Sequence, residues 1–467
     1  MARDLTAVAI RRVLYPLWAA RNHSSRLRYW QALERSQYDP DAVMRARQLT
    51  LLQELVRHAF THCPYYRRKL TAAGVRPEDI RRLDDIELIP TISKQEIQEH
   101  GPGLISATAD RRALIRDQTG GSTGAPLVFY YDNDRLDSRV AATLRHNRWA
   151  GWNLGDKAAV IWGAPQDLAR PPRLRDRVRD WIQDRRIMLD ASALDERSMA
   201  SFTTALRRYK PRILQAYSNT LGLYAQYLRS RGIDDIRPRG IVCSAEVLTA
   251  ENRRLIEQTF GCRVFDRYGC REFAVIASEC EVHDGMHINA ENLLVEVLAD
   301  GRSRRDENGQ IVVTDLRNLA MPLLRYEIRD VGSMLTRACS CPRKLPLLAI
   351  GGGRSTDFLL ATGGAIVSGV VIATYVTTNV PGIGQIQFVQ DAPAVIKIRL
   401  ARGPDWSSAT QAQLEAKARH YLGEDMRFEF EFCTVIPSEK SGKYRFSICN
   451  IPITRWQSPA QPRSPTA

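Results

Sequence analysis

The sequence predicts an α/β fold: a large N-terminal domain of mainly parallel sheets plus a small β element, and a small mobile α+β domain at the C-terminal end. Two observations support this prediction. From residue 113 onward, apolar strand-like runs alternate with helical stretches, the order expected of a parallel sheet with helical crossovers. After residue 355, two strands are followed by a helix and a further strand. The chain of 467 residues is also too long for one compact core, so two or three domains are expected.

Residues 1–110 are expected to be mostly helical. Apolar residues recur at helical spacing from Leu51 to Ala59, and Cys63-Pro-Tyr-Tyr is expected to end that helix. Ser93-Lys-Gln-Glu96 matches a capping box, in which each of the two outer side chains bonds the backbone N–H of the other residue. A second helix is therefore predicted to begin at this point.

The rest of the chain divides into a central and a C-terminal pattern. Central strands are predicted at 127–131, 158–162, 213–214, 240–243 and 263–265, with helices at 137–149, 195–209, 218–231 and 249–260. Short strands at 293–298, 309–314 and 331–335 are expected to form the small β element. In the C-terminal unit, strands are predicted at 385–390, 395–401 and 427–435, and a helix at 408–421.

Gly351-Gly-Gly353 is interpreted as a flexible joint, from which three parts are predicted. The large domain covers 1–352, and the small lid domain covers 353–455. The tail at 456–467 is rich in Pro, Ser and Gln and is predicted to be disordered.

Composition narrows the class of function. The formal net charge of +15 favours anionic small molecules, nucleic acid or membrane surfaces as partners. The basic residues are scattered, however, and no aromatic-plus-basic RNA pattern occurs. No apolar run is long enough to span a membrane, and arginines interrupt the apolar residues near the start, which argues against a signal peptide. The nine cysteines, an odd count, indicate a reducing compartment. We therefore expect a cytoplasmic protein without a nucleic-acid partner or membrane insertion.

The stretch Asp117–Pro126 is dense in Gly, Ser and Thr. Glycines allow close approach of a backbone to a ligand, and successive N–H groups together with the hydroxyls of Thr119, Ser122 and Thr123 could hold a phosphate. The alternative is a surface turn between two strands. A Walker loop is excluded, because no Gly-Lys-Ser/Thr closes the stretch.

Two more polar stretches follow predicted strands. Ser244-Ala-Glu246 ends one strand, and Asp266-Arg-Tyr-Gly-Cys-Arg-Glu272 follows another. Ligands of open α/β sheets bind where the strands end. Tyr268 could stack there on a flat base, and Glu272 could ligate Mg²⁺. The alternative is a Tyr-Gly turn with an exposed glutamate.

Three charged residues further along complete the candidates. Asp330 follows a strand-like run and could accept both hydroxyls of a ribose. Arg354 could meet a ribose or a phosphate. Lys443 closes Ser441-Gly-Lys443 and could neutralise charge on phosphorus or on an acyl-phosphate oxygen. Seen singly, these residues would equally suit a salt bridge in a linker and an exposed hairpin turn.

In combination and in chain order, these six motifs resemble those of the adenylate-forming (acyl-CoA synthetase-like) superfamily. The branch they resemble is the phenylacetate–CoA ligase family with its capsule-biosynthesis-associated relatives. Supporting stretches are Cys63-Pro-Tyr-Tyr, Pro90-Thr-Ile-Ser-Lys and Met321-Pro-Leu-Leu-Arg-Tyr. The resemblance runs from about residue 50 to about residue 450.

The resemblance implies an AMP-forming ligase that uses ATP and Mg²⁺ to activate a carboxylic acid, often aromatic, and then transfers the acyl group to coenzyme A. It implies the following roles. The β- and γ-phosphates would be held by Thr119, Gly120, Gly121, Ser122, Thr123 and Gly124. The adenine would lie between Tyr268 and the segment Ser244, Ala245 and Glu246, with Asp266 in the same nucleotide site. Glu272 would ligate Mg²⁺, Asp330 and Arg354 would meet the ribose, and Lys443 would assist adenylation.

The sequence departs from the family pattern at three positions. Leu127 replaces a loop lysine, Glu327-Ile-Arg-Asp330 replaces Arg-Thr-Gly-Asp, and Arg271 replaces a hydroxyl residue beside the nucleotide. Two alternatives therefore stay open: a biosynthetic synthetase that passes the acyl group to an amine or other acceptor, and a degenerate nucleotide-binding scaffold. The sequence leaves open the acid, the acceptor and the oligomeric state, a homodimer included.

Cysteines and a histidine make a second group of candidates. Cys280, Cys339 and Cys341 with one histidine would form a closed tetrahedral Zn²⁺ site, a pattern that some members of the resembled branch carry. His287 is favoured over His283, because Gly285-Met-His-Ile288 is typical of a strand start. The alternative is free buried thiols with surface histidines. The acyl pocket has aromatic candidates in Tyr131, Trp149, Trp162 and Tyr217, for which core packing is the alternative.

Overall fold

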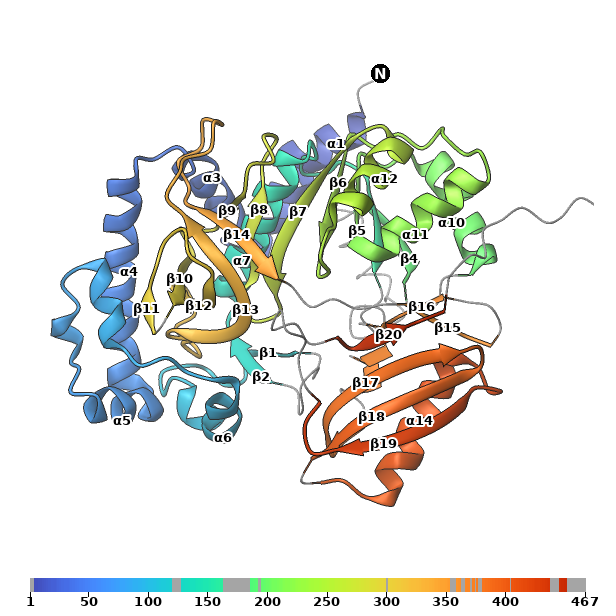
Figure 1. Ribbon diagram of the computed structural model, residues 1–467. Helices are drawn as coiled ribbons and strands as arrows, with labels where there is room; N and C mark the ends of the chain where they lie inside the picture. Colours follow the sequence, from blue (N-terminus) through green and yellow to red (C-terminus); the bar gives the residue numbers. More distant parts are fainter. Residues whose placement is uncertain are drawn as a thin grey trace, which may run out of the picture.

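The computed structural model describes residues 4–119, 127–162, 185–191, 195–299, 301–352, 358–362, 366–369, 372–373, 375–376, 380–403, 405–436 and 445–451. A large body carries one extended sheet with helices on both faces, and a smaller unit of strands and a helix lies beside it (Figure 1). In the part of the chain so described, no helix is both long and apolar enough to cross a membrane.

The N-terminal part of the described chain is helical, as predicted. Its elements are α1 (Leu5–Ala9), the π-helical η1 (Ile10–Leu14), α2 (Tyr15–Arg21), α3 (Arg26–Ser36), α4 (Asp41–His62), α5 (Pro64–Ala72), the 3-10 turns η2 (Pro77–Asp79) and η3 (Leu83–Leu88), and α6 (Lys94–Leu104). The capping box at the start of α6 is confirmed. Ser93 Oγ accepts from the N–H of Glu96 at 3.2 Å, and Glu96 Oε2 accepts from the N–H of Ser93 at 2.9 Å.

The central sheet begins with parallel strands, as predicted. These are β3 (Ala158–Trp162), β4 (Arg186–Asp190), β5 (Ile213–Tyr217), β6 (Gly240–Ser244) and β7 (Arg263–Cys270). The helices that cover them are α7 (Asn133–Trp149), α10 (Glu196–Tyr209), α11 (Ser218–Ser230) and α12 (Ala250–Phe260). A separate hairpin, β1 (Ile115–Gln118) and β2 (Val128–Tyr131), flanks the Gly/Ser/Thr stretch.

The β element is continuous with this sheet rather than a separate unit. β7 reverses into the antiparallel β8 (Ala274–Glu279), and the sheet continues in the order β11-β10-β12-β13-β14-β9-β8-β7-β6-β5-β3-β4. The added strands are β9 (Met286–Ile288), β10 (Leu293–Ala299), β11 (Arg302–Ser303), β12 (Gly309–Asp315), β13 (Tyr326–Leu335) and β14 (Leu347–Gly352). The interpretation of Gly351-Gly-Gly353 as a joint was wrong for its first two residues, because both lie in β14 and Gly352 pairs with Val331.

The two faces of the parallel strands have separate cores. α10, α11 and α12 pack on one face, in front in Figure 1, around Leu206, Tyr224 and Ile256. α7 packs on the other face, where Leu144 meets Ile213 and where Val242 and Phe265 form a small cluster with Ala150. Because strand side chains alternate between faces, Gln215 of β5 and Arg267 of β7 point to the α7 side, and both bond Asn147 of α7.

The C-terminal unit has its own core. Its elements are β15 (Phe358–Leu360), β16 (Ile366–Ser368), β17 (Ile383–Ala392), β18 (Val395–Arg402), α14 (Ser408–Leu422), β19 (Arg427–Cys433) and β20 (Ser447–Cys449). The core cluster of this unit runs from Leu359 to Phe446 and, among the described residues, includes none of the large body. Leu360 packs against the α10–α12 core, so the two units are in contact. The domain boundary at 352/353 stays a prediction, since 353–357 lie outside the described residues.

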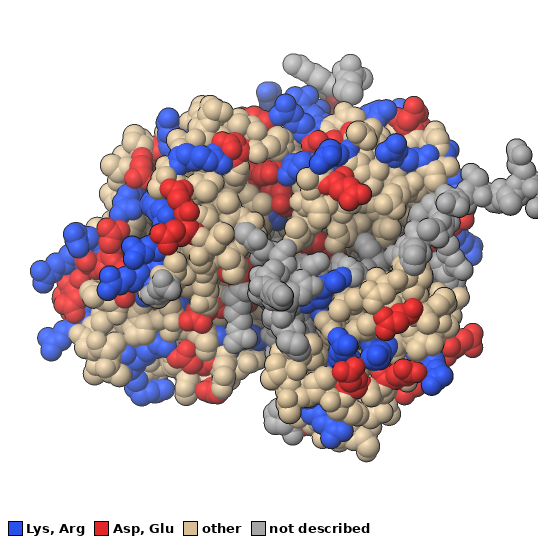
Figure 2. Space-filling view, viewed as in Figure 1, with Lys and Arg blue, Asp and Glu red and all other residues tan. Residues whose placement is uncertain are grey.

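Charge is spread over the surface. On the face shown in Figure 2, basic and acidic side chains are interspersed. This agrees with the scattered basic residues of the sequence, whose formal net charge is +15.

Candidate active site

Three predicted motifs meet at the carboxyl ends of the central strands. Ser244, the last residue of β6, lies in register with Arg267 of β7, and its Oγ donates to the Arg267 carbonyl at 2.9 Å. The next residue, Tyr268, donates from its hydroxyl to Asp330 Oδ2 of β13 at 2.8 Å. The candidates for binding adenine and ribose are therefore joined by a direct hydrogen bond.

Glu272 lies in the turn between β7 and β8 and is also tied to β13. Its side chain is buried, and Tyr326 donates a hydrogen bond from its hydroxyl to Glu272 Oε1 at 3.2 Å. Two tyrosines thus link the β7–β8 turn to β13 by hydroxyl–carboxylate hydrogen bonds. A carboxylate held in this way keeps lone pairs for a hard cation such as Mg²⁺.

Glu246 uses its carboxylate within the protein. Its Oε2 accepts from the N–H of Asn219 at 2.7 Å, at the N-terminus of α11, and Ser218 Oγ donates to its carbonyl at 3.1 Å. Burial raises the pKa of Glu246 to about 7. The preceding Ala245 has φ of +68°, a left-handed conformation that turns the chain sharply as it leaves β6. The carboxylate of Glu246 is therefore committed to the helix N-terminus.

Asp266 faces acidic and basic neighbours on the α12 side. Its N–H donates to Glu279 Oε2 at 2.9 Å, and Arg253 binds both oxygens of Glu279 at 2.7 and 2.9 Å. Burial, and secondly the charge of Glu279, raise the pKa of Asp266 to about 7. His283 also bonds Glu279, at 3.0 Å from its Nδ1, so this histidine belongs to the acid–base network of β8.

The base of the Gly/Ser/Thr stretch is closed by two hydrogen bonds. The N–H of Thr119 donates to the Leu127 carbonyl at 2.9 Å, and the N–H of Leu127 donates to Thr119 Oγ1 at 3.0 Å. Leu127 is fully buried, which accounts for an apolar residue where the family has a lysine. Five of the predicted phosphate ligands and two other candidates lie outside the described residues: Gly120, Gly121, Ser122, Thr123, Gly124, Arg354 and Lys443.

Arg271, which replaces a hydroxyl residue of the family pattern, pairs with a carboxylate of β1, the strand that leads into the Gly/Ser/Thr stretch. Its Nη1 lies 3.5 Å from Asp117 Oδ1 of β1. Arg139 of α7 donates to the Arg271 carbonyl and lies over the ring of Tyr131 at 4.4 Å. The ion pair connects the β7–β8 turn to the Gly/Ser/Thr stretch, so this departure from the family pattern has a structural partner.

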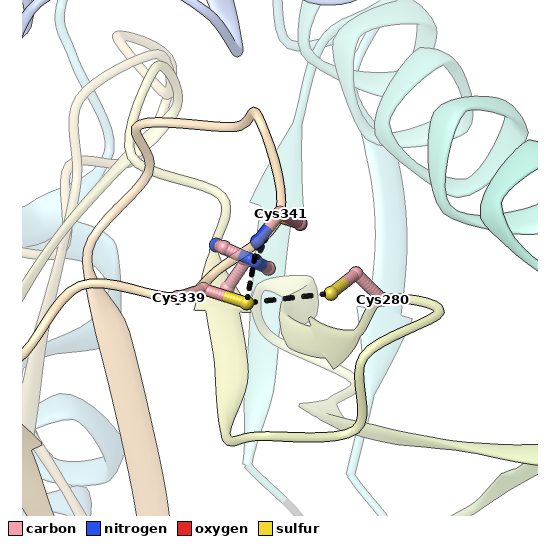
Figure 3. Close-up of side chains that lie close together, drawn as sticks. Cys280, Cys339 and Cys341 are labelled. Carbon is pink, nitrogen blue, oxygen red and sulfur yellow. Dashed lines mark hydrogen bonds between the residues drawn. The ribbon is translucent and has the colours of Figure 1, made fainter.

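The predicted metal ligands come together in one buried cluster. One donor atom each from Cys280, His287, Cys339 and Cys341 lies within 4.8 Å of all the others. Cys280 follows β8, His287 lies in β9, and the two remaining cysteines lie in the connection from β13 to β14. Figure 3 shows the three cysteines converging from these segments.

The distances within this cluster suit a tetrahedral zinc ion. Cys280 Sγ and Cys339 Sγ are 3.7 Å apart, and Cys341 Sγ is 3.3 Å from His287 Nε2. Two sulfurs each about 2.3 Å from a tetrahedral zinc would lie roughly 3.8 Å apart. His287 Nδ1 meets the Leu345 carbonyl at 3.1 Å, which leaves Nε2 for a metal. Without a metal, a thiolate is unfavourable at this buried position, because burial raises the pKa of Cys280 to about 12.

The aromatic candidates for the acyl pocket divide into two groups. Trp162 and Tyr217 lie together at the ends of β3 and β5, with ring centroids 4.2 Å apart. Trp149 instead contacts His287 edge-on at 5.7 Å and donates from Nε1 to Gln37, so it belongs to the core beside the cysteine cluster.

Sequence reasoning missed several residues of the site. Tyr326 was recognised only as part of the stretch Met321-Pro-Leu-Leu-Arg-Tyr, without a role of its own. Asn219, Arg139 and Asn147 were not predicted as site residues. Each of them acts through a partner that is distant in the sequence, for example Tyr326 with Glu272. The one signal in the sequence was for Tyr326, which places a hydroxyl at the start of the strand that carries Asp330.

Comparisons with known proteins identify relatives of this chain. Residues 359–450 match the model of the CapK C-terminal domain. The phenylacetate–coenzyme A ligase of Escherichia coli (strain K12) is 28% identical over 329 residues, which cover 68% of this chain and 73% of that protein. The ligase of the same name from Pseudomonas putida is 26% identical, with 68% and 72% covered. Protein CapK of Staphylococcus aureus is 25% identical, with 79% and 81% covered.

Solved structures support the fold. A 2-hydroxyisobutyryl-CoA ligase, in complex with 2-HIB-AMP and CoA in the thioesterification state, superimposes with a TM-score of 0.62 at 17% identity, covering 89% of this chain and 92% of that one. The same enzyme in the postadenylation state gives a TM-score of 0.59 at 18% identity, with the same coverage. The chain is therefore a relative of the phenylacetate–coenzyme A ligases and of CapK, with the fold of a CoA ligase.

Proposed function

We propose that the chain is an AMP-forming acid–CoA ligase. A carboxylate attacks the α-phosphorus of ATP, which gives an acyl-adenylate and pyrophosphate, and coenzyme A then displaces AMP. Relatives named as phenylacetate–coenzyme A ligases, and a structural neighbour named with an acyl-adenylate and CoA, support this reaction. An aromatic acid is the substrate class suggested by the relatives.

One observation carries the proposal for this chain. The hydrogen bond between Tyr268 and Asp330 joins the candidate adenine platform to the candidate ribose acceptor, and the bond between Glu272 and Tyr326 holds the candidate Mg²⁺ ligand beside them. A scaffold that had lost nucleotide chemistry would have no need of two distant segments joined through one buried and one half-buried carboxylate. Catalysis at such a site would rest on positioning and on stabilisation of developing charge.

Several roles rest on the sequence motifs. Lys443 would stabilise charge during adenylation, Arg354 would meet the ribose, and the 120–124 loop would hold the phosphates. Thr119 would set the base of that loop, because its hydroxyl already accepts the N–H of Leu127. Ser244, Ala245 and Asp266 would line the nucleotide site, and the carboxylate of Glu246 would support it by anchoring α11.

The acceptor defines the second candidate function. A transfer to an amine or another acceptor would use the same adenylation site, and no acyl-carrier domain is seen in the sequence.

Cytoplasmic location and a homodimer stay predictions.

The test is ATP–pyrophosphate exchange with aryl, arylacetic and aliphatic acids, with and without CoA. Exchange with one class of acid, and AMP release that depends on CoA, is the expected result. Glu272→Gln should reduce exchange by about a hundredfold or more, because Mg²⁺ loses a charged ligand. The matched control is Glu251→Gln, an exposed position on α12, which should leave the rate unchanged. Exchange without CoA-dependent turnover would favour an amine acceptor, and no ATP binding at all would favour the scaffold.

We also propose that Cys280, His287, Cys339 and Cys341 hold a structural Zn²⁺. Three thiolates and one imidazole make a closed set with no position for substrate. The ion would join β8 and β9 to the connection between β13 and β14, and so would fix the strand that carries Asp330 against the strands that carry Tyr268 and Glu272.

A further inference from the structure

Arg267 is a buried cation without a carboxylate partner. Its side chain is 9% exposed, and its Nη2 donates to Asn147 Oδ1 at 2.7 Å. Its Nε is fully buried and has no hydrogen-bond partner among the described residues. Burial alone lowers the pKa of Arg267 to about 10. No aspartate or glutamate of the described chain forms an ion pair with it.

Other buried arginines of the protein are neutralised. They pair as follows: Arg26 with Asp137 at 3.2 Å, Arg135 with Asp315 at 2.8 Å, Arg145 with Glu291 at 2.6 Å, and Arg325 with Glu296 at 2.9 Å. A guanidinium does not lose its proton in proteins, and an unpaired charge is costly to bury. Among the described residues, Arg267 therefore departs from the pairing that these buried arginines share.

More polar groups surround Arg267 on the α7 face of the sheet. Gln215 of β5 donates to the same Asn147 oxygen at 3.1 Å. His146, the neighbour of Asn147 on α7, is 1% exposed, and neither of its ring nitrogens has a partner in the described structure. Arg267, His146, Asn147 and Gln215 are called the Arg267 cluster below. Hydrogen-bonding groups so deeply buried are almost always satisfied in the functional state of a protein.

The Arg267 cluster lies next to the candidate active site, on the α7 face: Arg267 is in register with Ser244, the last residue of β6, and Gln215 lies two residues before the end of β5. Arg267 precedes Tyr268 by one residue, and Gln215 precedes Tyr217, the end of β5, by two. Each residue of a strand advances the chain by about 3.3 Å. A group bound by the cluster would therefore lie on the α7 face, between the level of the strand ends and a level about 7 Å below them.

We propose that the Arg267 cluster binds a second carboxylate of the acid substrate, so that the enzyme activates dicarboxylic acids at the end remote from Arg267. This inference rests on the proposed adenylation function. The reacting carboxylate is a poor partner for Arg267, since it loses its negative charge when the acyl-adenylate forms. A second carboxylate keeps its charge through both half-reactions. It would take the free Nε edge of the guanidinium, and a neutral imidazole at His146 offers one further N–H donor.

The test compares matched pairs of acids in ATP–pyrophosphate exchange: phenylacetate with 4-carboxyphenylacetate, and butyrate with succinate. In the wild type, one diacid should exceed its monocarboxylic partner in kcat/KM. Arg267→Met should lower kcat/KM for that diacid by about a hundredfold, mainly through KM, because a site built for a charged group loses its partner. Exchange with the monocarboxylic acid should fall far less than exchange with the diacid. Arg267→Lys should restore part of the preference.

The matched control is Arg263→Met, an exposed position on the same strand and the same face, which should keep the diacid preference. If the Arg267 variants do not fold, two measurements on the wild type test whether it prefers diacids. One is the ratio of kcat/KM between each diacid and its monocarboxylic partner, and the other is the thermal shift that each acid produces without ATP. Strong exchange with monocarboxylic acids, no preference for diacids and no change in Arg267→Met would overturn this inference while leaving the ligase intact. Failure of every acid in the wild type would instead count against the proposed function.

Discussion

At the scale of single residues, burial decides what a motif residue does. Glu246 fits a nucleotide motif by sequence, yet its carboxylate accepts the Asn219 N–H at the start of α11. Burial raises its pKa to about 7 from an ordinary value of 4.5. The folded protein thus holds this proton more tightly than the unfolded chain does. The resulting stabilisation is complete below about pH 4.5 and is lost as the pH rises through about 7.

Glu246→Gln should therefore gain stability relative to the wild type as the pH increases. Glutamine keeps an acceptor for the Asn219 N–H but carries no charge to bury. Between about pH 5 and about pH 8, the difference in free energy of unfolding should change by up to about 3 kcal/mol in favour of the variant. The measurement is the urea midpoint of both proteins across this range. Glu251→Gln, exposed on α12, should track the wild type, and a pH-independent difference for Glu246→Gln would contradict the argument.

At the scale of elements, close backbone approach fixes the β7–β8 turn. A Cβ at Gly269 would lie 2.0 Å from the carbonyl oxygen of Ala274, inside the antiparallel pair of β7 and β8. Gly269→Ala must therefore push the two strands apart, which moves Tyr268 and Glu272 relative to β13. We expect exchange activity to fall by at least about tenfold, since small displacements of positioned groups are costly in rate.

The control for this variant is Gly101→Ala. Gly101 lies in α6, where a Cβ would meet no atom within 4 Å. Alanine is the better helix former by about 1 kcal/mol, so this change should be neutral or stabilising. Full activity in Gly269→Ala would show that the turn tolerates a shift and that its geometry does not position the site.

The cysteine cluster lies at the far end of β8 from the β7–β8 turn, since Cys280 follows the last residue of this strand. Cys341→Ser should remove the bound zinc and cost at least about 3 kcal/mol of stability, because metal-binding free energy at a structural site is also folding free energy. Metal content by mass spectrometry and the thermal midpoint with and without a chelator measure this effect. Cys433→Ser, in β19 away from the cluster, should retain one zinc per chain. A wild-type protein that is stable and free of zinc would contradict the prediction.

Local sequence patterns were sufficient to predict most helices and strands, but not to predict which residues contact one another across the sheet. The capping box at Ser93 and the helix at 218–230 depend on neighbours in the chain, and both were predicted from the sequence. The continuity of β8 and β9 with the parallel strands depends on pairing between distant segments, which no periodicity reports. His287 was favoured over His283 as a candidate ligand because its strand start could be recognised, and it lies in the cysteine cluster. The pairing of Arg271 with Asp117, and the absence of such a partner for Arg267, were visible only in three dimensions.

At the scale of the whole molecule, two units with separate cores share the proposed reaction. Within the part of the chain that the structure describes, the C-terminal core includes no residue of the large body, and residues 359–450 match the CapK C-terminal domain. The described residues on either side of 437–444 are held by hydrogen bonds. The N–H of Ile436 donates to Gln385 Oε1 at 2.7 Å, and Gln387 Nε2 donates to the Arg445 carbonyl at 2.9 Å. Both bonds are made to side chains of β17, so this strand anchors the described residues on either side of 437–444.

Lys443→Ala should consequently separate adenylation from nucleotide binding. The large body carries the candidate groups for adenine, ribose and Mg²⁺, so ATP should still bind to the variant. Exchange should fall by about a hundredfold or more, because the charge that develops at the α-phosphate loses its cation. Isothermal titration with ATP and the exchange assay measure the two effects, and Lys440→Ala, three residues earlier, is the matched control. Equal loss of ATP binding and exchange would instead place Lys443 in nucleotide binding, and unchanged exchange would remove the C-terminal unit from the adenylation step.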